Sequence, residues 1–164
     1  MKCKIITTTK QSEANEISLF ADTVSEPLMD DPYNGLDPRD IDTITTYYDG
    51  EILEQNGEIR ISYHEDDASG MGGVEAVIAF NCDEPNEVTL TRSGSVNTIM
   101  LFSQGKRTIS VYQTPFMPFE IGIFAKRVKN EITTRGVLEI SYIIEIKGAL
   151  AQKTEMKLEI KKND

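Results

Sequence analysis

Residues 138–146 read Leu-Glu-Ile-Ser-Tyr-Ile-Ile-Glu-Ile, with an apolar side chain at every second position. Residues 150–160 repeat this alternation, and so do residues 58–63 and 119–126. Successive side chains of a strand point to opposite faces, so a half-buried antiparallel strand produces this period of two. Helical spacing is absent from residue 42 onward. The sequence therefore predicts an all-β protein.

Turn signals separate these segments. Asn56-Gly57 is the strongest short hairpin dipeptide, because both turn residues adopt positive φ. Further breaks follow at roughly one strand and one turn apart: Ser69-Gly70, Gly72-Gly73, Pro85-Asn86, Ser93-Gly94, Gln104-Gly105, Arg135-Gly136 and Lys147-Gly148. A meander of this length closes on itself to remove exposed edges. We expect residues 1–164 to form one domain, a closed or nearly closed antiparallel up-and-down β-barrel of about eight strands with at most one short helix.

The front of the chain has a different texture. Residues 2–9 are rich in β-branched side chains and predict a first strand. Residues 12–42 then carry nine acidic residues against Arg39 alone, together with three of the six prolines. A short helix over Ser12–Ala21 followed by a loop fits this composition. We interpret residues 12–42 as an acidic insertion that is poorly packed or lies across the basic strands after residue 88.

Charge and composition exclude several classes of function. The net charge of −10 opposes general binding to nucleic acid or to anionic membranes, and the short basic run at residues 126–129 is too small to reverse this. No apolar run is long enough to span a membrane, and the first residues lack the apolar core of a signal peptide. We therefore expect a cytoplasmic protein.

Catalytic and metal-binding signatures are incomplete. Cys3 and Cys82 with the single His64 do not supply a zinc site, and there is no G-x-S-x-G motif. The acidic runs at residues 64–67 and 30–37 lack the spacing of a calcium loop and are typical of hydrated turns. We predict no metal, no cofactor and no catalytic residues.

Arg92 is the strongest candidate for a binding role. It shares a strand face with Val88 and Leu90, and an inward arginine has to be paired. Two interpretations stay open: Arg92 anchors a carboxylate in a cavity with the Tyr112 hydroxyl beside it, or it closes the barrel at a strand end before Ser93-Gly94. Glu120 is either the partner of Arg92, a pocket carboxylate or a solvated charge. Tyr63, on the face of Ile59 and Ile61, completes the candidate ligand-binding set of Arg92, Tyr112, Tyr63 and Glu120.

Several motifs occur together in one order. Tyr63 precedes an acidic, glycine-rich turn, and residues 89–96 read Thr-Leu-Thr-Arg-Ser-Gly-Ser-Val. Gly105-Lys106-Arg107, residues 112–116 (Tyr-Gln-Thr-Pro-Phe) and residues 119–123 (Phe-Glu-Ile-Gly-Ile) follow. Over residues 42–161 the chain resembles the YwiB-like family of uncharacterised bacterial β-barrel proteins, a domain-of-unknown-function family of the calycin type. The resemblance implies a lipocalin-like barrel of about eight strands in the cytoplasm of a Gram-positive-type bacterium, and no activity. The acidic insertion departs from the family pattern.

An eight-stranded barrel has an interior that is filled by side chains or holds one small ligand. We expect a non-catalytic binder of a small apolar or amphipathic molecule, with a carboxylate as one form of its polar end. The alternative is a structural or protein-interaction module with a filled barrel.

Overall fold

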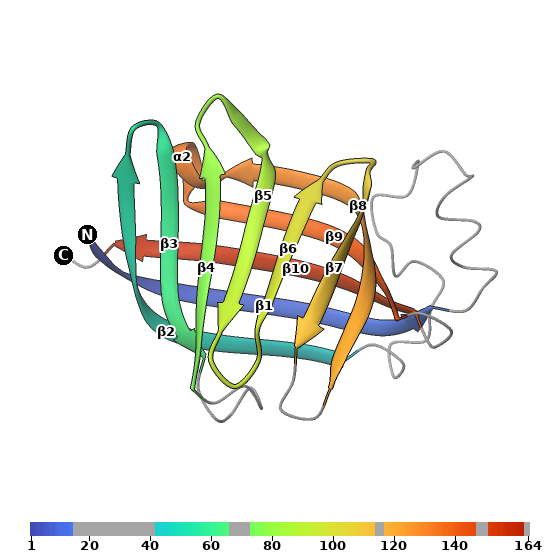
Figure 1. Ribbon diagram of the computed structural model, residues 1–164. Helices are drawn as coiled ribbons and strands as arrows, with labels where there is room; N and C mark the ends of the chain where they lie inside the picture. Colours follow the sequence, from blue (N-terminus) through green and yellow to red (C-terminus); the bar gives the residue numbers. More distant parts are fainter. Residues whose placement is uncertain (15–41, 66–72, 114–116, 147–150, 163–164) are drawn as a thin grey trace.

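The computed structural model describes residues 1–14, 42–65, 73–113, 117–146 and 151–162. These residues form ten antiparallel strands in one sheet and a single short helix (Figure 1). The elements are β1 (Lys2–Ala14), β2 (Asp42–Gln55), β3 (Glu58–Glu65), β4 (Val74–Asn81), β5 (Glu84–Ser93), β6 (Thr98–Ser103), β7 (Arg107–Gln113), β8 (Pro118–Glu131), α2 (Ile132–Arg135), β9 (Val137–Ile146) and β10 (Ala151–Lys162). Within these ranges, no helix has the length and apolar character needed to cross a membrane.

The sheet is an up-and-down meander that is nearly closed into a barrel. Its strand order is β6-β5-β4-β3-β2-β1-β10-β9-β8-β7, so the first and last strands pair along their length. In Figure 1, β3 to β6 cross in front of β1, β10 and β9, and the two termini lie side by side. The predicted all-β barrel is confirmed, with ten strands rather than about eight among the described residues.

Local sequence explains the strand boundaries. Asn56 and Gly57 have φ of 54° and 80°, as the hairpin between β2 and β3 requires. In β3 the burial alternates strictly, with Ile59, Ile61 and Tyr63 inside and their neighbours at the surface or half-buried. The period of two in the sequence therefore corresponds to the two faces of the barrel wall.

The first strand is longer than expected. β1 continues to Ala14 and pairs with both β2 and β10, with Ser12 opposite Lys153. The expected helix over Ser12–Ala21 is therefore wrong at its start, because the ladder to β10 holds residues 12–14 in strand geometry. The rest of the acidic insertion up to residue 41 lies outside the described residues, and so does its expected packing.

The barrel has two different rims. At one rim, which we call the turn rim, short turns join β2 to β3, β4 to β5 and β6 to β7, and α2 joins β8 to β9. At the other, the loop rim, the odd-numbered strands end and the next strands begin. The four internal segments outside the described residues all connect strands at the loop rim. Apart from residues 94–97 between β5 and β6, the connections that the structure describes therefore lie at the turn rim.

Apolar side chains fill the barrel toward the turn rim. The largest of the fully buried side chains are Phe102, Ile5, Ile61, Ile78, Leu90, Met100, Ile123, Leu138, Ile140 and Leu158. Ile132 of α2 is also part of this core. Burial of such side chains contributes about 1.5–3 kcal/mol each. The apolar half of the interior is thus the part that stabilises the barrel.

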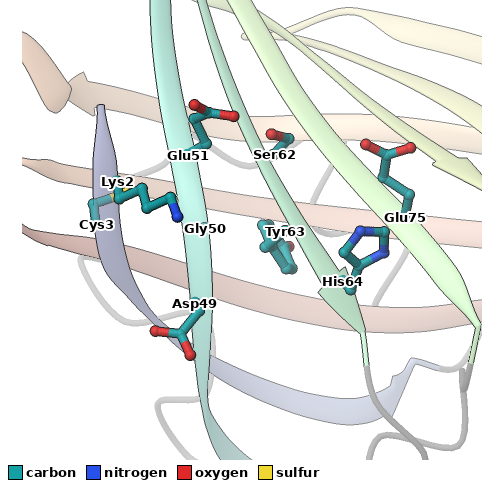
Figure 2. A pocket seen from close by; sticks show the side chains of 9 residues that line it. All are labelled: Lys2, Cys3, Asp49, Gly50, Glu51, Ser62, Tyr63, His64 and Glu75. Carbon is teal, nitrogen blue, oxygen red and sulfur yellow. The ribbon is translucent and has the colours of Figure 1, made fainter.

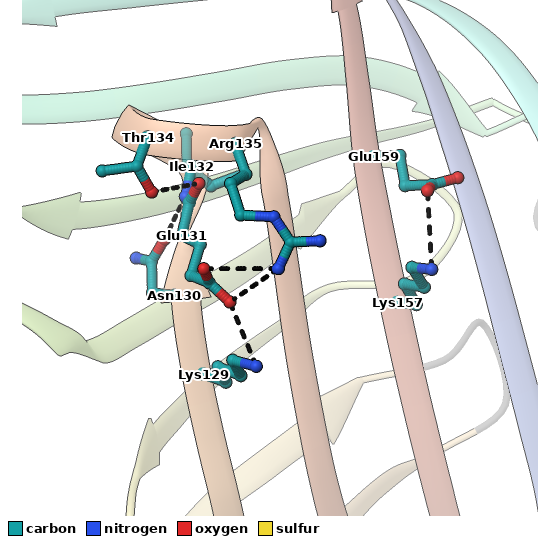
Figure 3. A network of polar contacts seen from close by, with 8 residues as sticks. All are labelled: Lys129, Asn130, Glu131, Ile132, Thr134, Arg135, Lys157 and Glu159. Atoms are coloured by element: carbon teal, nitrogen blue, oxygen red, sulfur yellow. Dashed lines mark hydrogen bonds and ion pairs between the residues drawn. The ribbon is translucent and has the colours of Figure 1, made fainter.

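Polar contacts fix the closure around α2 (Figure 3). Glu131 accepts hydrogen bonds from Arg135 and forms an ion pair with Lys129 at 3.2 Å. The Ile132 backbone N–H donates to Asn130 Oδ1, and the Asn130 amide donates to the carbonyl of Pro85 on β5. These contacts tie the β8–α2 junction to the opposite wall, which closes the turn rim.

The wall is incomplete between β6 and β7, the two ends of the sheet order. Asn97 and Gln113 exchange backbone hydrogen bonds at 3.0 and 2.9 Å next to the loop rim. Elsewhere along this junction, side-chain hydroxyls reach across: Thr108 Oγ1 donates to the Leu101 carbonyl at 3.0 Å, and Ser110 Oγ donates to the Ile99 carbonyl. We call this junction the seam. It is held by hydroxyl groups where other strand pairs have a backbone ladder.

Candidate functional site

Arg92 occupies an inward position near the loop rim. The register places Tyr63 opposite Ala76, Ala76 opposite Arg92, and Arg92 opposite Thr98, so these residues form one row across β3 to β6. Val88 and Leu90 share the face of Arg92 and are fully buried. Ala76, which lies between Tyr63 and Arg92 in this row, is fully buried and contributes only a methyl group. The predicted inward direction of Arg92 follows from this alternation.

Glu65 is the ion-pair partner of Arg92. Arg92 Nε donates to Glu65 Oε1 at 3.2 Å, and the side chains are 19% and 7% exposed. The contact uses one donor of the guanidinium and one oxygen of the carboxylate. Each partner supplies the counter-charge that makes the other tolerable away from water. Arg92 is therefore compensated within its own barrel.

Four tyrosines belong to the same region. Tyr48 and Tyr63 have ring centroids 4.9 Å apart, and Tyr142 packs on Phe102 at 4.7 Å. Tyr63, Tyr142 and Tyr112 each lie close enough to Arg92 and Glu65 to feel both charges. The interior at the loop rim thus combines polar and aromatic side chains with aliphatic ones such as Val74, which lies opposite Glu65.

Burial and charge shift the pKa values of these groups. Burial raises the pKa of Tyr63 well above its usual range and also raises that of Tyr142, against the opposing effect of the Arg92 charge. Tyr112, which is half-buried, shifts in the same direction for the same reasons. Burial is the largest single influence on Arg92 and disfavours its charge, but Glu65 together with Tyr142 and Tyr63 reverses this and raises the pKa of the guanidinium. At neutral pH the tyrosines are neutral and Arg92 is charged.

Three inward polar atoms near the loop rim lack partners. Glu65 Oε2, Thr98 Oγ1 and Thr154 Oγ1 are buried and have no hydrogen-bond partner in the described structure. Thr154 lies beside Tyr142 in the ladder, but its hydroxyl does not reach hydrogen-bonding geometry. Unpartnered buried polar groups cost about 1–3 kcal/mol each, so a group of them calls for an explanation. They are available to water or to a ligand.

A pocket of about 360 Å³ lies at the loop-rim end of the seam. Arg92 and Thr98 border it, and so do Ile99 and Val111, whose side chains are exposed. Its volume is at the lower end of the range of small-molecule sites, about 300–1,000 Å³. Because Ile99 and Val111 point outward, the pocket opens on the outer face of the barrel wall, next to the strand positions of Arg92 and Thr98.

A second hollow lies on the outside of β1 to β4 (Figure 2). It measures about 560 Å³, and Lys2, Asp49, Glu51, His64 and Glu75 line it with exposed side chains. Lys4 pairs with Asp49, and the amino terminus lies 4.0 Å from Glu51. Because solvent screens these exposed charges, the hollow offers only weak electrostatic attraction to a ligand.

The structure unites three of the four predicted ligand-binding residues. Arg92, Tyr63 and Tyr112 belong to one cluster, together with Glu65 and Tyr142, which were not among the predicted residues. Glu120 is exposed and sits in the β8 ladder opposite Val111. The interpretation of Glu120 as the partner of Arg92 is therefore wrong, because Glu120 faces outward and Glu65 takes that place.

The signal for Glu65 was present in the sequence. It continues the inward series Ile59, Ile61 and Tyr63 by one more step of two. The acidic residues that follow it made a hydrated turn the simpler interpretation. His64 points to the opposite, exposed face, and among the described residues no group of His, Cys, Asp and Glu is arranged to hold a metal ion.

Comparison with known proteins addresses the family and the fold. A family model described as "Domain of unknown function (DUF1934)" matches residues 36–158. The crystal structure of the YwiB protein from Bacillus subtilis is similar with a TM-score of 0.67, over 99% of this chain and 94% of that chain, at 16% identity. At this identity the likeness establishes the fold alone. No curated protein matches the chain. The resemblance to the YwiB-like family is thus confirmed, and the chain belongs to the DUF1934 family of domains of unknown function.

Proposed function

We propose that this protein is a non-catalytic binder of a small amphipathic molecule, whose polar group meets Arg92 and Glu65 inside the loop rim. One observation carries the proposal. The Glu65 carboxylate is 7% exposed, and its Oε2 has no hydrogen-bond partner, whereas its Oε1 accepts a hydrogen bond from Arg92 Nε. In native proteins, buried polar atoms rarely lack a hydrogen-bond partner. A bound molecule with hydrogen-bonding groups would satisfy them.

The surroundings support an amphipathic rather than a wholly polar molecule. The pocket at the seam has Ile99 and Val111 as apolar walls and borders Arg92. Buried side chains already occupy the barrel interior, so the apolar part of a ligand has the pocket at the seam and not the barrel axis. Such a site takes a short apolar chain with one polar end.

Native mass spectrometry of protein purified from its own host tests this function. We expect a co-purified small molecule on the wild-type protein and its loss in Arg92→Ala. Arg60→Ala is the matched control, because Arg60 pairs with Glu58 on the exposed side of β3 and should leave the bound molecule in place. An unliganded wild-type protein that also binds none of the probes described below would refute the proposal.

A second candidate, a protein-interaction module, is favoured by a different observation. Four aliphatic side chains on β6 and β7 point outward and are exposed: Ile99, Leu101, Ile109 and Val111. The outer face of an antiparallel barrel is ordinarily polar, and a group of exposed apolar residues marks a contact surface. If this surface joins two copies, sedimentation velocity will show a dimer that Ile109→Lys dissociates. A monomer at all concentrations would remove self-association from this candidate.

A further inference from the structure

We propose that the ligand carries an uncharged head group with both a hydrogen-bond donor and an acceptor, of the carboxamide class, rather than a carboxylate or an ammonium group. This inference deepens the proposed function and rests on it. It also changes the sequence-based expectation of a carboxylate-bearing ligand, because that expectation placed Arg92 in the barrel without Glu65.

The two charges of the site already compensate each other. Of the described side chains with inward positions near the loop rim, Arg92 and Glu65 are the charged ones, and they are in direct contact. The tyrosines around them are neutral at physiological pH. Glu75, the acidic residue opposite His64 in the β3–β4 ladder, is exposed and points away from the interior. The described inward side chains of the site therefore carry no net charge.

A charged head group would disturb this balance. A carboxylate placed against Arg92 would bring a second negative charge next to Glu65. An ammonium group placed against Glu65 would do the same to Arg92. In either case one charge is left buried without a partner, and this costs far more than a single hydrogen bond contributes. A neutral head group avoids the penalty.

The unused groups of the pair define the chemistry that is left. Glu65 Oε2 is an acceptor without a donor. Arg92 spends Nε on Glu65, so its terminal N–H groups remain as donors that Glu65 does not occupy. A carboxamide offers an N–H to the first and a C=O to the second, and hydrogen bonds to charged partners are the strong ones. Thr98 Oγ1, next to Arg92 in the ladder, is a further partner of either kind.

The apolar remainder of the ligand has a place beside this head group. The pocket at the seam borders Arg92 and Thr98, but its apolar side chains, Ile99 and Val111, point outward. Its volume of about 360 Å³ therefore suits a short aliphatic chain on the outer face, at the strand pair that lacks a backbone ladder. A linear molecule with an amide at one end and a saturated chain at the other would thus reach through the seam, with its amide at the Arg92–Glu65 pair and its chain on the outer face.

Isothermal titration with three probes of equal chain length tests the inference: octanamide, octanoate and octylammonium. We expect octanamide to bind the wild-type protein roughly tenfold more tightly than either charged probe, the ratio that one added hydrogen bond to a charged group produces. Octanoate or octylammonium binding as tightly as octanamide would overturn the inference and leave the proposed function standing. Absence of binding by all three at millimolar concentration would overturn both.

Two isosteric variants make the test specific to the pair. In Glu65→Gln the charge of Arg92 is no longer compensated, so octanoate should become the tightest probe. In Arg92→Gln the Glu65 carboxylate has no counter-charge, so octylammonium should bind more tightly than the other two probes. An unchanged ranking in folded variants would overturn the inference. The ranking on the wild-type protein decides it even where a variant fails to fold.

Discussion

Arg92 Nε and Glu65 Oε1 lie 3.2 Å apart, whereas the second oxygen of the same carboxylate is buried with no partner. The two residues are separated by 27 positions in the sequence and meet through the β3–β4–β5 hairpins. A half-used ion pair inside a barrel has two consequences. It makes the stability of the loop rim depend on charge balance, and it leaves hydrogen-bonding groups for a ligand.

Removing one partner of this pair should destabilise the protein. We expect Arg92→Met to lower the free energy of unfolding by roughly 3 kcal/mol, because Glu65 is then buried without its counter-charge. The double variant Glu65→Gln/Arg92→Met should recover more than half of that loss, since no charge is left. Urea unfolding at neutral pH measures both.

Arg60→Met supplies the control for this experiment. Arg60 and Glu58 also form an ion pair, 3.1 Å long, but both side chains are about half exposed. Exposed pairs contribute about 0–1 kcal/mol, so this variant should change little. Equal losses in Arg60→Met and Arg92→Met would show that burial of the second pair has no energetic role.

The buried tyrosines should make the fold sensitive to alkaline pH. Burial raises the pKa of Tyr63 and Tyr142 in the folded protein, whereas in the unfolded chain tyrosine ionises near pH 10. Above about pH 10 the unfolded state therefore binds fewer protons than the folded state, and stability falls as the pH rises further. Below that pH the contribution is fully present.

Urea midpoints followed by circular dichroism between about pH 8 and pH 11 measure this dependence. Tyr63→Phe/Tyr142→Phe should show a shallower decline, because the two groups that resist ionisation are gone. A slope identical to that of the wild-type protein would contradict the assignment of the alkaline sensitivity to these two residues.

Much of this architecture follows from local pattern. The period of two places Val88, Leu90 and Arg92 on one face, and Asn56-Gly57 sets a hairpin, so the barrel and the inward Arg92 could be predicted. The partner of Arg92 could not, because pairing between distant strands depends on their register. Glu65 obeys the inward parity of β3, but its acidic surroundings favour a hydrated turn. The orientation of Glu120 was ambiguous in the sequence, because a charged residue between apolar neighbours is compatible with the inner or the outer face of the barrel.

The break in the barrel wall between β6 and β7 could not be predicted from the sequence either. Gln104-Gly105 is an ordinary turn signal, and β6 and β7 look like one more hairpin. In the structure the Gly105 N–H donates to the Ala125 carbonyl of β8 at 2.8 Å, so the turn is anchored to β8. The outward side chains of β7 include Ile109 and Val111, whereas Thr108 and Ser110 point inward together with Tyr112. Such reversed polarity is a signal that could have marked β7 as unusual.

The hydroxyl contacts across the seam should control its opening. We expect Thr108→Val/Ser110→Ala to cost roughly 2 kcal/mol, about 1 kcal/mol for each lost hydrogen bond. Amide hydrogen exchange should accelerate in β6 and β7 before it does in β1 and β10, which share a continuous ladder. Ser141→Ala, on the outward side of β9, is the control and should leave the exchange pattern unchanged. Uniform acceleration over all strands would argue against a weak seam.

The turn after Arg92 depends on a close approach between two backbone segments. Gly94 has φ of +139°, and a Cβ at this position would lie 2.1 Å from the carbonyl oxygen of Gly73, the residue before β4. Gly94→Ala must therefore push β5 and β4 apart at the loop rim, where Arg92 meets Glu65. We expect a loss of roughly 3 kcal/mol from the clash and the backbone strain together. Ligand affinity should fall with it, because the pair no longer keeps its geometry.

Gly57→Ala separates the two causes of this loss. Gly57 also has a positive φ, +80°, but a Cβ there would meet nothing within 4 Å. It should therefore cost about 1 kcal/mol from backbone strain alone and leave binding intact, because it lies at the turn rim. Thermal unfolding and octanamide titration on both variants give the comparison. If Gly94→Ala is no worse than Gly57→Ala in both measurements, the contact between Gly94 and Gly73 does not hold the site in place.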